Sequence, residues 1–250
     1  MSQIFRKLVS CLSLIYQRQF FLLAELVCAA LIPSRIFATK KYLFYRLDRQ
    51  QQTSPNIKSI RKNIVKNISE NIEIFIGTES SVSEMVDTLY NGKPKTLEFY
   101  EEFYRNGIEA WIARGEDKIV GVIWLYTGSY LLNWEGYDAW LLQVAVEPTA
   151  KFVANVFVQP ECRGQGIFPV IAEQCFTVYS ENEFYSCVEE SNVPSIKSHE
   201  KIGFRRYAAV YFVRFFQQTY CLSVPKKGKW KYFRLQRGNA IVLDLLSKQK

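Results

Sequence analysis

The chain has 250 residues, which suffices for one full hydrophobic core and a subdomain but is too short for a multi-domain machine. Apolar residues make up 48% of it and aromatic residues 15%, with no long biased tract, so the composition excludes a disordered protein. The net charge of +8 favours acidic partners such as phosphates, nucleic acid or anionic membrane, without choosing among them.

Cysteine and histidine usage argues against a metal site. The six cysteines are scattered without a CxxC pair, and His199 is the only histidine. Zinc sites need clustered Cys and His ligands, so no metal is expected. A chain of this length does not need a disulfide framework, and reduced thiols in a cytoplasmic protein are the favoured interpretation.

Residues 1–70 are predicted to form a helical extension that is both basic and apolar. The apolar run Phe20–Ile32 is shorter than the ~20 residues that a membrane span needs. Gln17–Gln19 interrupts the apolar part and no small-x-small cleavage site follows, which argues against a signal peptide. Two alternatives stay open: the helices pack on the following domain or a partner subunit, or they lie peripherally on the inner face of an anionic membrane. The basic side chains that would meet such a surface are Arg6, Lys7, Arg18, Arg35, Lys40 and Lys41.

Gln50–Pro55 is typical of a connector, and the boundary of the second domain, residues 71–250, is placed near residue 70. A strand and a helix are predicted to open this domain, followed by a hairpin whose turn is Gly115–Lys118. The expected ranges are Ile72–Ile76 for the strand, Thr78–Tyr90 for the helix, and Glu109–Arg114 and Ile119–Leu125 for the hairpin strands.

The second half of the chain alternates strands and helices. Thr127–Tyr137 is predicted to be a loop, and Ala139–Val146 is an apolar segment that is either a strand or a wall of the active site. The following elements are a central strand at Phe152–Val158, a helix that begins after Gly164, a strand at Phe184–Val188, a helix at Pro194–Ile202 and a strand at Phe204–Phe216. The resulting order is β-α-β-β-β-α-β-α-β.

The turn between the central strand and its helix has the composition of an anion cradle. It passes through Arg163–Gly166 and presents free backbone N–H groups at the positive end of a helix dipole. Glycines let a phosphate approach those amides. Glycine-rich turns also serve as tight connections only, so the loop alone leaves both interpretations open.

Two spaced motifs supply a sharper indication. Val156–Gly166, which reads VFVQPECRGQG, resembles the acetyl-CoA-binding motif V-x-P-x-x-R-G-x-G of the GNAT acyltransferases. Asn192–Phe204, which reads NVPSIKSHEKIGF, is similar to their second motif, N-x-x-(A/S) followed by Y-x-x-x-G-F. The resemblance is specific over residues 151–215, looser over 72–150 and absent before about residue 70.

This resemblance implies an α/β GNAT fold, a mixed and mostly antiparallel twisted sheet flanked by helices. It also implies acetyl-CoA as co-substrate: the loop amides hold the pyrophosphate, and the central strand pairs with the pantetheine arm like an added strand. Phe168 stands where the family usually has Gly or Ala, so its side chain must point away from the loop. The implied CoA-binding residues are Val156, Phe157, Val158, Arg163, Gly164, Gln165, Gly166, Phe168, Asn192 and Ser195.

The family's reaction is direct attack of an amine on the thioester, without a covalent enzyme intermediate. His199 occupies the place of the tyrosine that commonly protonates the leaving thiolate, and it is either that acid or a helix-packing residue. The central strand offers neutral Asn155 where relatives often carry an acid. The candidate general base is therefore Glu189, with Glu190, Glu147 and Asp138 as alternatives, or no strong base if the acceptor amine is neutral. Cys162 is interpreted as incidental.

The expected partners are a CoA thioester and a small-molecule amine acceptor, for which an amino sugar of envelope or polysaccharide metabolism is the first hypothesis. A non-catalytic acyl-CoA-binding protein and a peripheral membrane scaffold are the competing classes. The basic stretch Lys226–Arg234 is predicted to be an edge strand. A functional contact with an anion is the second interpretation, and binding of nucleic acid is the third. No pattern in the sequence predicts an oligomeric state.

Overall fold

The computed structural model describes residues 37–47, 72–91, 94–133, 141–145, 147–215, 218–225, 231–235 and 241–244. Its helices are α5 (Glu79–Tyr90), α6 (Pro94–Arg105), η1 (Pro160–Cys162), α7 (Ile167–Val178) and α8 (Val193–Lys201). Its strands are β1 (Phe37–Leu47), β2 (Glu73–Ile76), β3 (Glu109–Arg114), β4 (Ile119–Thr127), β5 (Ser129–Asn133), β6 (Leu141–Ala145), β7 (Ala150–Val158), β8 (Glu183–Glu189), β9 (Phe204–Phe215), β10 (Gln218–Pro225), β11 (Lys231–Leu235) and β12 (Ile241–Asp244).

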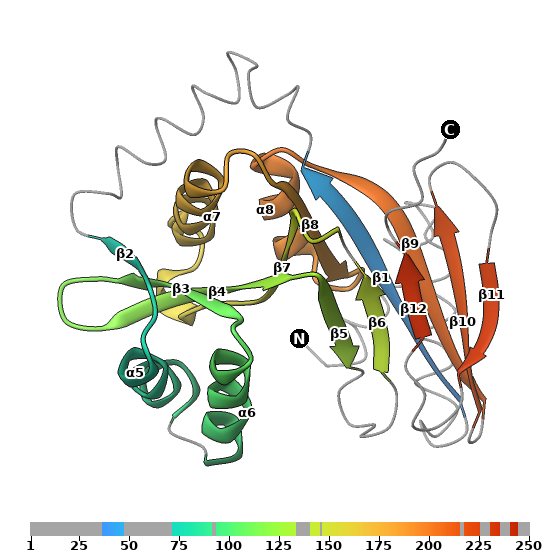
Figure 1. Ribbon diagram of the computed structural model, residues 1–250, viewed down its shortest axis with the longest axis horizontal. Helices are drawn as coiled ribbons and strands as arrows, with labels where there is room; N and C mark the ends of the chain where they lie inside the picture. Colours follow the sequence, from blue (N-terminus) through green and yellow to red (C-terminus); the bar gives the residue numbers. More distant parts are fainter. Residues whose placement is uncertain are drawn as a thin grey trace, which may run out of the picture.

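A large sheet organises the described residues. Its strands lie in the order β11-β10-β9-β1-β8-β7-β4-β3-β2, and only β7 and β8 are parallel neighbours within it. Helices α7 and α8 lie on one face of this sheet and α5 and α6 on the other (Figure 1). The predicted fold class, a mixed and mostly antiparallel sheet flanked by helices, is confirmed.

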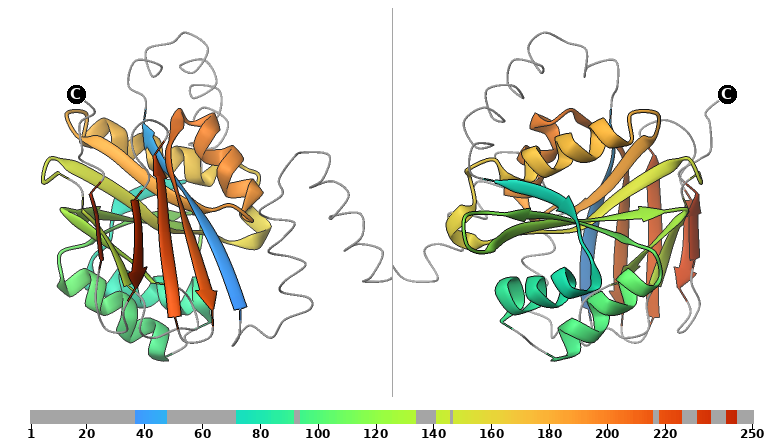
Figure 2. Two further views of the ribbon diagram at one scale, coloured as in Figure 1. Left: turned by 90° about the vertical axis from the view of Figure 1, so that its right-hand side faces the viewer. Right: turned by 60° about the vertical axis from the view of Figure 1, so that its left-hand side comes forward.

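Strand β1 corrects the predicted helical extension for residues 37–47. It pairs antiparallel with both β8 and β9, and Figure 2 shows it beside β9 in the middle of the sheet. Phe44 and Tyr45 point to opposite faces and are both almost fully buried, which is the burial of a central strand. Residues 1–36 and 48–70 of the predicted helical extension, with the connector at 50–55, lie outside the described residues. No helix in the described part of the chain is long and apolar enough to cross a membrane.

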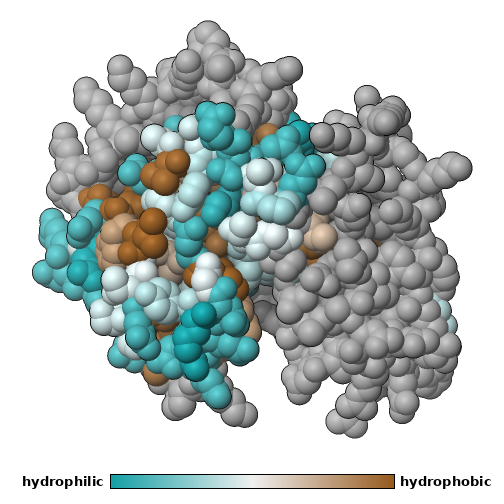
Figure 3. Space-filling view, in the orientation of Figure 1, coloured by the Kyte–Doolittle hydropathy of each residue, from teal (hydrophilic) through white to brown (hydrophobic). Residues whose placement is uncertain are grey.

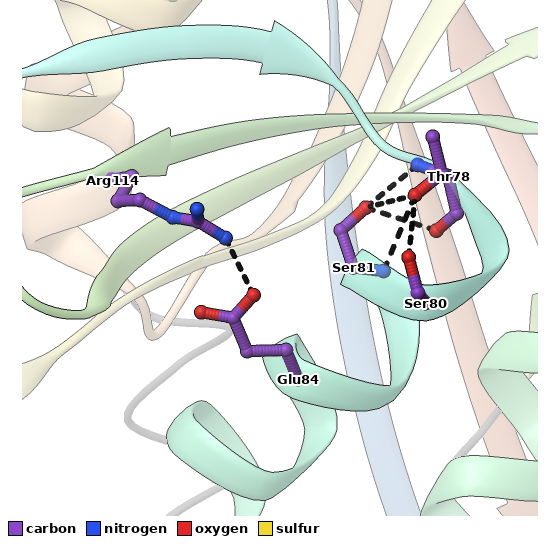
Figure 4. Close-up of polar contacts among 5 residues, drawn as sticks. All are labelled: Thr78, Ser80, Ser81, Glu84 and Arg114. Carbon is purple, nitrogen blue, oxygen red and sulfur yellow. Dashed lines mark hydrogen bonds and ion pairs between the residues drawn. The ribbon is translucent and has the colours of Figure 1, made fainter.

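Helix α5 begins with reciprocal capping. The Thr78 hydroxyl accepts from the Ser81 backbone N–H, and the Ser81 hydroxyl accepts in turn from the Thr78 N–H at 2.6 Å (Figure 4). The same view shows Glu84 paired with Arg114 of the neighbouring sheet. The cap satisfies N–H groups that the first helical turn leaves free, so the predicted start of this helix is confirmed.

The predicted hairpin is also confirmed. β3 and β4 pair antiparallel around a turn in which the Gly115 N–H donates to the Lys118 carbonyl at 2.9 Å. The loop predicted for residues 127–137 is wrong at 129–133, because β5 follows β4 directly after Gly128. β5, β6 and β12 form a separate three-stranded sheet, so the ambiguous segment at 139–146 contains a strand.

Two apolar cores cover the two faces of the large sheet. One packs α5 and α6 against β4 and β7 and includes Trp124 and Phe152, both fully buried. The other packs α7 against the opposite face and includes Ile171 and Phe184. The outer surface of α5 and α6 is mainly hydrophilic (Figure 3), as expected of helices that bury only one face.

A partly buried ion pair lies at the start of β7. The Lys151 ammonium donates to Glu109 at 3.1 Å and to the Thr127 hydroxyl at 3.0 Å, and it lies 4.2 Å from the centre of the Tyr179 ring at the end of α7. Tyr179 donates to the same carboxylate at 2.7 Å. A buried charge needs such partners, so this network fixes the end of α7 to the sheet.

At the other end of the large sheet, β11 pairs with β10 only, within the described ranges. The prediction of a basic edge strand is therefore confirmed for residues 231–234. Residues 226–230 lie outside the described part of the chain.

Candidate active site

Strands β7 and β8 part halfway along their length. They pair in parallel from Ala150 opposite Glu183 to Val153 opposite Ser186, and the recorded ladder ends there. β7 continues to Val158 but pairs only with β4 on its other side. We call the opening beyond the Val153–Ser186 pair the fork. On its β7 side, residues 154–158 present strand backbone without a β8 partner among the described residues.

A bulge in β7 lies next to the start of the fork. Trp124 is opposite Ala154 and Val122 is opposite Phe157, so two residues of β7 face the single residue between them on β4. Asn155 takes the left-handed conformation, with φ of 47°. Asparagine tolerates this conformation better than most residues, and an extra residue bends a strand at such a point. The bulge therefore turns β7 where the two strands part.

The Asn155 side chain is held beside the bulge. Its amide donates to the Tyr126 hydroxyl at 2.7 Å. Burial raises the pKa of Tyr126 well above its ordinary value, so this hydroxyl keeps its proton at any physiological pH. Neither side chain of this pair is therefore charged at physiological pH.

The backbone after β7 forms the turn that the sequence predicts. η1 leads into Gly164 and Gly166, whose φ angles are 78° and 87°, and α7 starts at Ile167. Both glycines adopt a backbone conformation that L-residues disfavour. No backbone hydrogen bond recorded for the described residues uses the N–H groups of Gly164, Gln165 or Gly166. Pro169 lies in the first turn of α7, where a missing N–H costs nothing.

Side chains around the loop divide between the two faces. Val156 and Val158 pack against the core beneath α7, whereas the Phe157 ring lies 4.9 Å from that of Tyr90 on α5. The Arg163 guanidinium donates to the Val158 carbonyl at 3.1 Å and lies 5.8 Å from the Phe157 ring centre. Arg163 is exposed, so its charge remains available to an anion.

Phe168 points into the core. Its ring is buried and its centre lies 4.7 Å from that of the His199 imidazole on α8. The departure at this position therefore packs α7 against α8 and leaves the loop surface free of a bulky side chain.

Asn192 caps the N-terminus of α8, and its side-chain carbonyl accepts from the Ser195 N–H at 3.2 Å. Asn192 lies three residues after the end of β8, and the Asn192 N–H donates to the Glu189 carbonyl at 2.9 Å. The end of β8 and the end of β7 share one edge of the sheet because the two strands are parallel. Asn192 and Ser195 thus lie at the same edge as the glycine loop.

His199 is enclosed rather than exposed to the fork. It is 2% exposed, its Nδ1 lies 2.8 Å from the Ser195 carbonyl, and its Nε2 lies 3.0 Å from the Ser186 hydroxyl. Desolvation lowers the pKa of His199 to about 4, although the hydrogen bond to Ser195 opposes this shift. The imidazole is therefore neutral at pH 7. Of the two roles that the sequence leaves open, this environment favours the packing role.

Glu189 is held by neighbours. Its carboxylate lies 3.2 Å from the Lys40 ammonium and accepts from the Ser191 hydroxyl at 2.8 Å. Glu190 pairs with Lys41, which is largely buried. Both lysines belong to β1, and their ion pairs with Glu189 and Glu190 favour, for residues 37–47, the alternative in which the extension packs on the following domain. Among the other candidates, Glu147 precedes β7 at the end away from the fork and Asp138 lies outside the described residues.

Sequence reasoning missed Ser186, which lies at the start of the fork. Its hydroxyl is 1% exposed and donates to the Val153 carbonyl at 2.9 Å. A serine within the apolar strand at 184–188 was the available signal, because a buried hydroxyl needs a partner. The register of β7 and β8, which the sequence does not give, was needed to place it. No group of three or more His, Cys, Asp or Glu within the described ranges could hold a metal ion.

The model of the acetyltransferase (GNAT) family matches residues 80–204, half of the chain. The chain belongs to the GNAT family. The matched region runs from α5 to the start of β9 and so contains the fork, the glycine loop and α8. Members of this family use acetyl-CoA as co-substrate. No curated protein sequence matches this GNAT protein.

Solved structures resemble this GNAT protein at low sequence identity. A conserved protein of unknown function from Staphylococcus epidermidis aligns with 11% identity and a TM-score of 0.50, over 75% of this chain and 65% of its own. A GNAT acetyltransferase from Colwellia psychrerythraea aligns with 14% identity and a TM-score of 0.47, over 72% of this chain and 56% of its own. The chain thus spans less than two thirds of either structure, and the first likeness supports the fold alone.

Proposed function

We propose that this protein transfers an acetyl or short acyl group from CoA to an amine acceptor by direct attack within a ternary complex. The observation that carries the proposal is the fork between β7 and β8, which opens beyond Val153 and Ser186 and leads directly into the glycine loop. An extended ligand arm and its terminal phosphates would find strand backbone and free amides in one continuous path.

The loop from Arg163 to Gly166 would hold the pyrophosphate. The Arg163 N–H donates to the Pro160 carbonyl at 3.3 Å, whereas the N–H groups of Gly164, Gln165 and Gly166 have no backbone acceptor among the described residues and lie at the positive end of α7. A Cβ built on Gly164 meets no atom within 4 Å, so the space in front of this residue is open to a ligand. Arg163 adds an exposed positive charge, and the Phe168 amide would complete the cradle.

The backbone of Val156, Phe157 and Val158 would pair with the pantetheine arm. Phe157 and Val158 have a β4 partner on one side only and Val156 lies in the bulge, and an extended amide-containing arm can add to such a strand edge. Asn192 and Ser195 lie at the same edge of the sheet and would contact the arm from α8. Because the bulge at Asn155 bends β7 there, the acyl end of the ligand would stop near the start of the fork.

In this proposal the chain supplies positioning rather than a strong acid or base. The nitrogen of a neutral amine attacks the thioester carbon, the carbon–sulfur bond breaks, and the proton that the nitrogen loses reaches the thiolate through solvent. His199 is neutral and enclosed, and Glu189 is paired with Lys40, so neither is placed in the proton path. The amino-sugar acceptor is proposed from the family resemblance alone.

The test is thiol release from acetyl-CoA with a panel of amines that includes amino sugars, beside calorimetric measurement of CoA binding. We expect acceptor-dependent release of CoA. Binding without release for any amine would favour the non-catalytic alternative, and absence of binding would overturn the proposal.

The loop assignment has its own variant test. We expect Gly164→Val to weaken CoA binding by about tenfold or more, because it disturbs the amides and fills the open space, and tenfold corresponds to about 1.4 kcal/mol. Gly107→Val is the matched control: Gly107 also has a positive φ, of 73°, and nothing within 4 Å of its Cβ, but it lies between α6 and β3. Equal affinity of the two variants would contradict the assignment.

A further inference from the structure

Three elements are tied together at the point where the fork begins. Ser186 of β8 is the last residue that pairs with β7, and its hydroxyl contacts the Val153 carbonyl of β7 at 2.9 Å. His199 of α8 contacts the same hydroxyl at 3.0 Å. Both side chains are at most 2% exposed. The contact therefore joins β7, β8 and α8 out of reach of bulk solvent.

His199 is itself fixed from several sides. Its Nδ1 must donate to the Ser195 carbonyl, because a carbonyl oxygen only accepts, and this leaves Nε2 of the neutral ring as an acceptor toward Ser186. The ring centre lies 4.7 Å from that of Phe168, 5.4 Å from that of Phe204 and 6.0 Å from that of Tyr45. The single hydroxyl proton of Ser186 is thus shared between two acceptors, the Val153 carbonyl and His199 Nε2. The surrounding packing holds both acceptors in place.

A ligand arm in the fork would lie against the next pair of residues that joins β7 to β8. In this protein the next pair is Val153 and Ser186, and it carries a side-chain hydrogen bond in addition to the backbone ladder. We propose that Ser186 and His199 form a latch that fixes where the fork begins and so positions the thioester of an acyl-CoA for attack. The inference rests on the proposed function. Ser186 and His199 are both positioning residues, because the latch does not require either side chain to contact the reacting atoms.

The latch and the glycine loop lie at different points of the path, so their contributions to kinetics differ. Removal of the Ser186 hydroxyl leaves the amides of residues 164–166 intact, and the affinity for the CoA phosphates should persist. Misplacement of the thioester by a fraction of an ångström lowers the rate of attack. The latch therefore predicts an effect on kcat rather than on the KM for acetyl-CoA.

The experiment compares steady-state thiol release by the full chain and by Ser186→Ala, Ser186→Thr and His199→Gln, each checked for folding by circular dichroism. We expect kcat of Ser186→Ala to fall about tenfold, the value of one lost hydrogen bond of about 1.4 kcal/mol, with KM changed less than about twofold. Ser186→Thr keeps the hydroxyl and should recover most of the rate. The kcat and KM of His199→Gln should resemble those of Ser186→Ala.

Ser81→Ala is the matched control, since it removes another buried serine hydroxyl, from α5 and away from the fork. Its kcat should remain that of the wild type. An unchanged kcat in folded Ser186→Ala, or a fall in kcat equal to that of Ser81→Ala, would overturn the latch. A wild-type chain that releases no thiol with any amine would instead overturn the proposed function, so the two failures are distinguishable.

Discussion

At the scale of single residues, burial decides what the only histidine can do. The His199 ring on α8 packs against Phe168 of α7 and Tyr45 of β1 and is hydrogen-bonded to Ser186 and Ser195. The sequence motif places a proton donor at this position, but desolvation disfavours the charged imidazole that a donor requires. Sequence alone could not choose between the two roles, because burial depends on helices and strands that meet only in the fold.

The same burial predicts a pH dependence of stability. The pKa of His199 is about 4 in the folded chain against 6.5 in the unfolded one, so between these values the unfolded state binds a proton that the folded state does not. The free energy of unfolding should therefore fall as the pH is lowered from 6.5 toward 4, by up to about 1.4 kcal/mol per pH unit. Urea unfolding of the wild type and of His199→Gln measures this, and the variant should lack that part of the slope. Parallel pH profiles would show that the folded chain protonates His199 normally.

At the scale of elements, the sequence predicts structures with local determinants correctly. It does not predict pairing between strands that are far apart in the chain. The hairpin at 109–125 and the strand–loop–helix at 152–178 have their determinants within a few residues, and each forms as expected. β1 follows an apolar segment and has its partners in β8 and β9, about 140 or more residues later in the chain. Nothing local in residues 37–47 reveals those partners, so the sequence alone assigns the segment to the helical extension.

Phe44 tests the place of β1. It is fully buried in the core that also packs α5 and α6, and its ring centre lies 6.4 Å from that of Phe152. Phe44→Ala should lower the free energy of unfolding by about 3–5 kcal/mol, the usual cost of a large cavity in a core. Arg46→Ala is the control in the same strand, since this side chain is 47% exposed and its ion pair with Glu183 contributes at most about 1 kcal/mol. Equal, small effects of both variants in chemical denaturation would place residues 37–47 outside the sheet.

At the scale of the whole molecule, the site is the place where the sheet divides. The sequence predicted the glycine loop and the start of α8 from two motifs, and the fold brings them to one edge of the sheet. It did not predict the start of the fork, the bulge at Asn155 or the contact of Ser186 with His199. These features depend on strand register, which is set by pairing between segments far apart in the chain.

Hydrogen–deuterium exchange with and without acetyl-CoA measures ligand entry into the fork most directly. If the fork and the glycine loop bind the co-substrate, exchange should slow at backbone amides of residues 154–158 and 164–168. The hairpin strands at 109–114 and 119–125 serve as the internal reference and should exchange equally in both samples. Unchanged exchange over residues 154–168 at saturating acetyl-CoA would contradict binding at the fork.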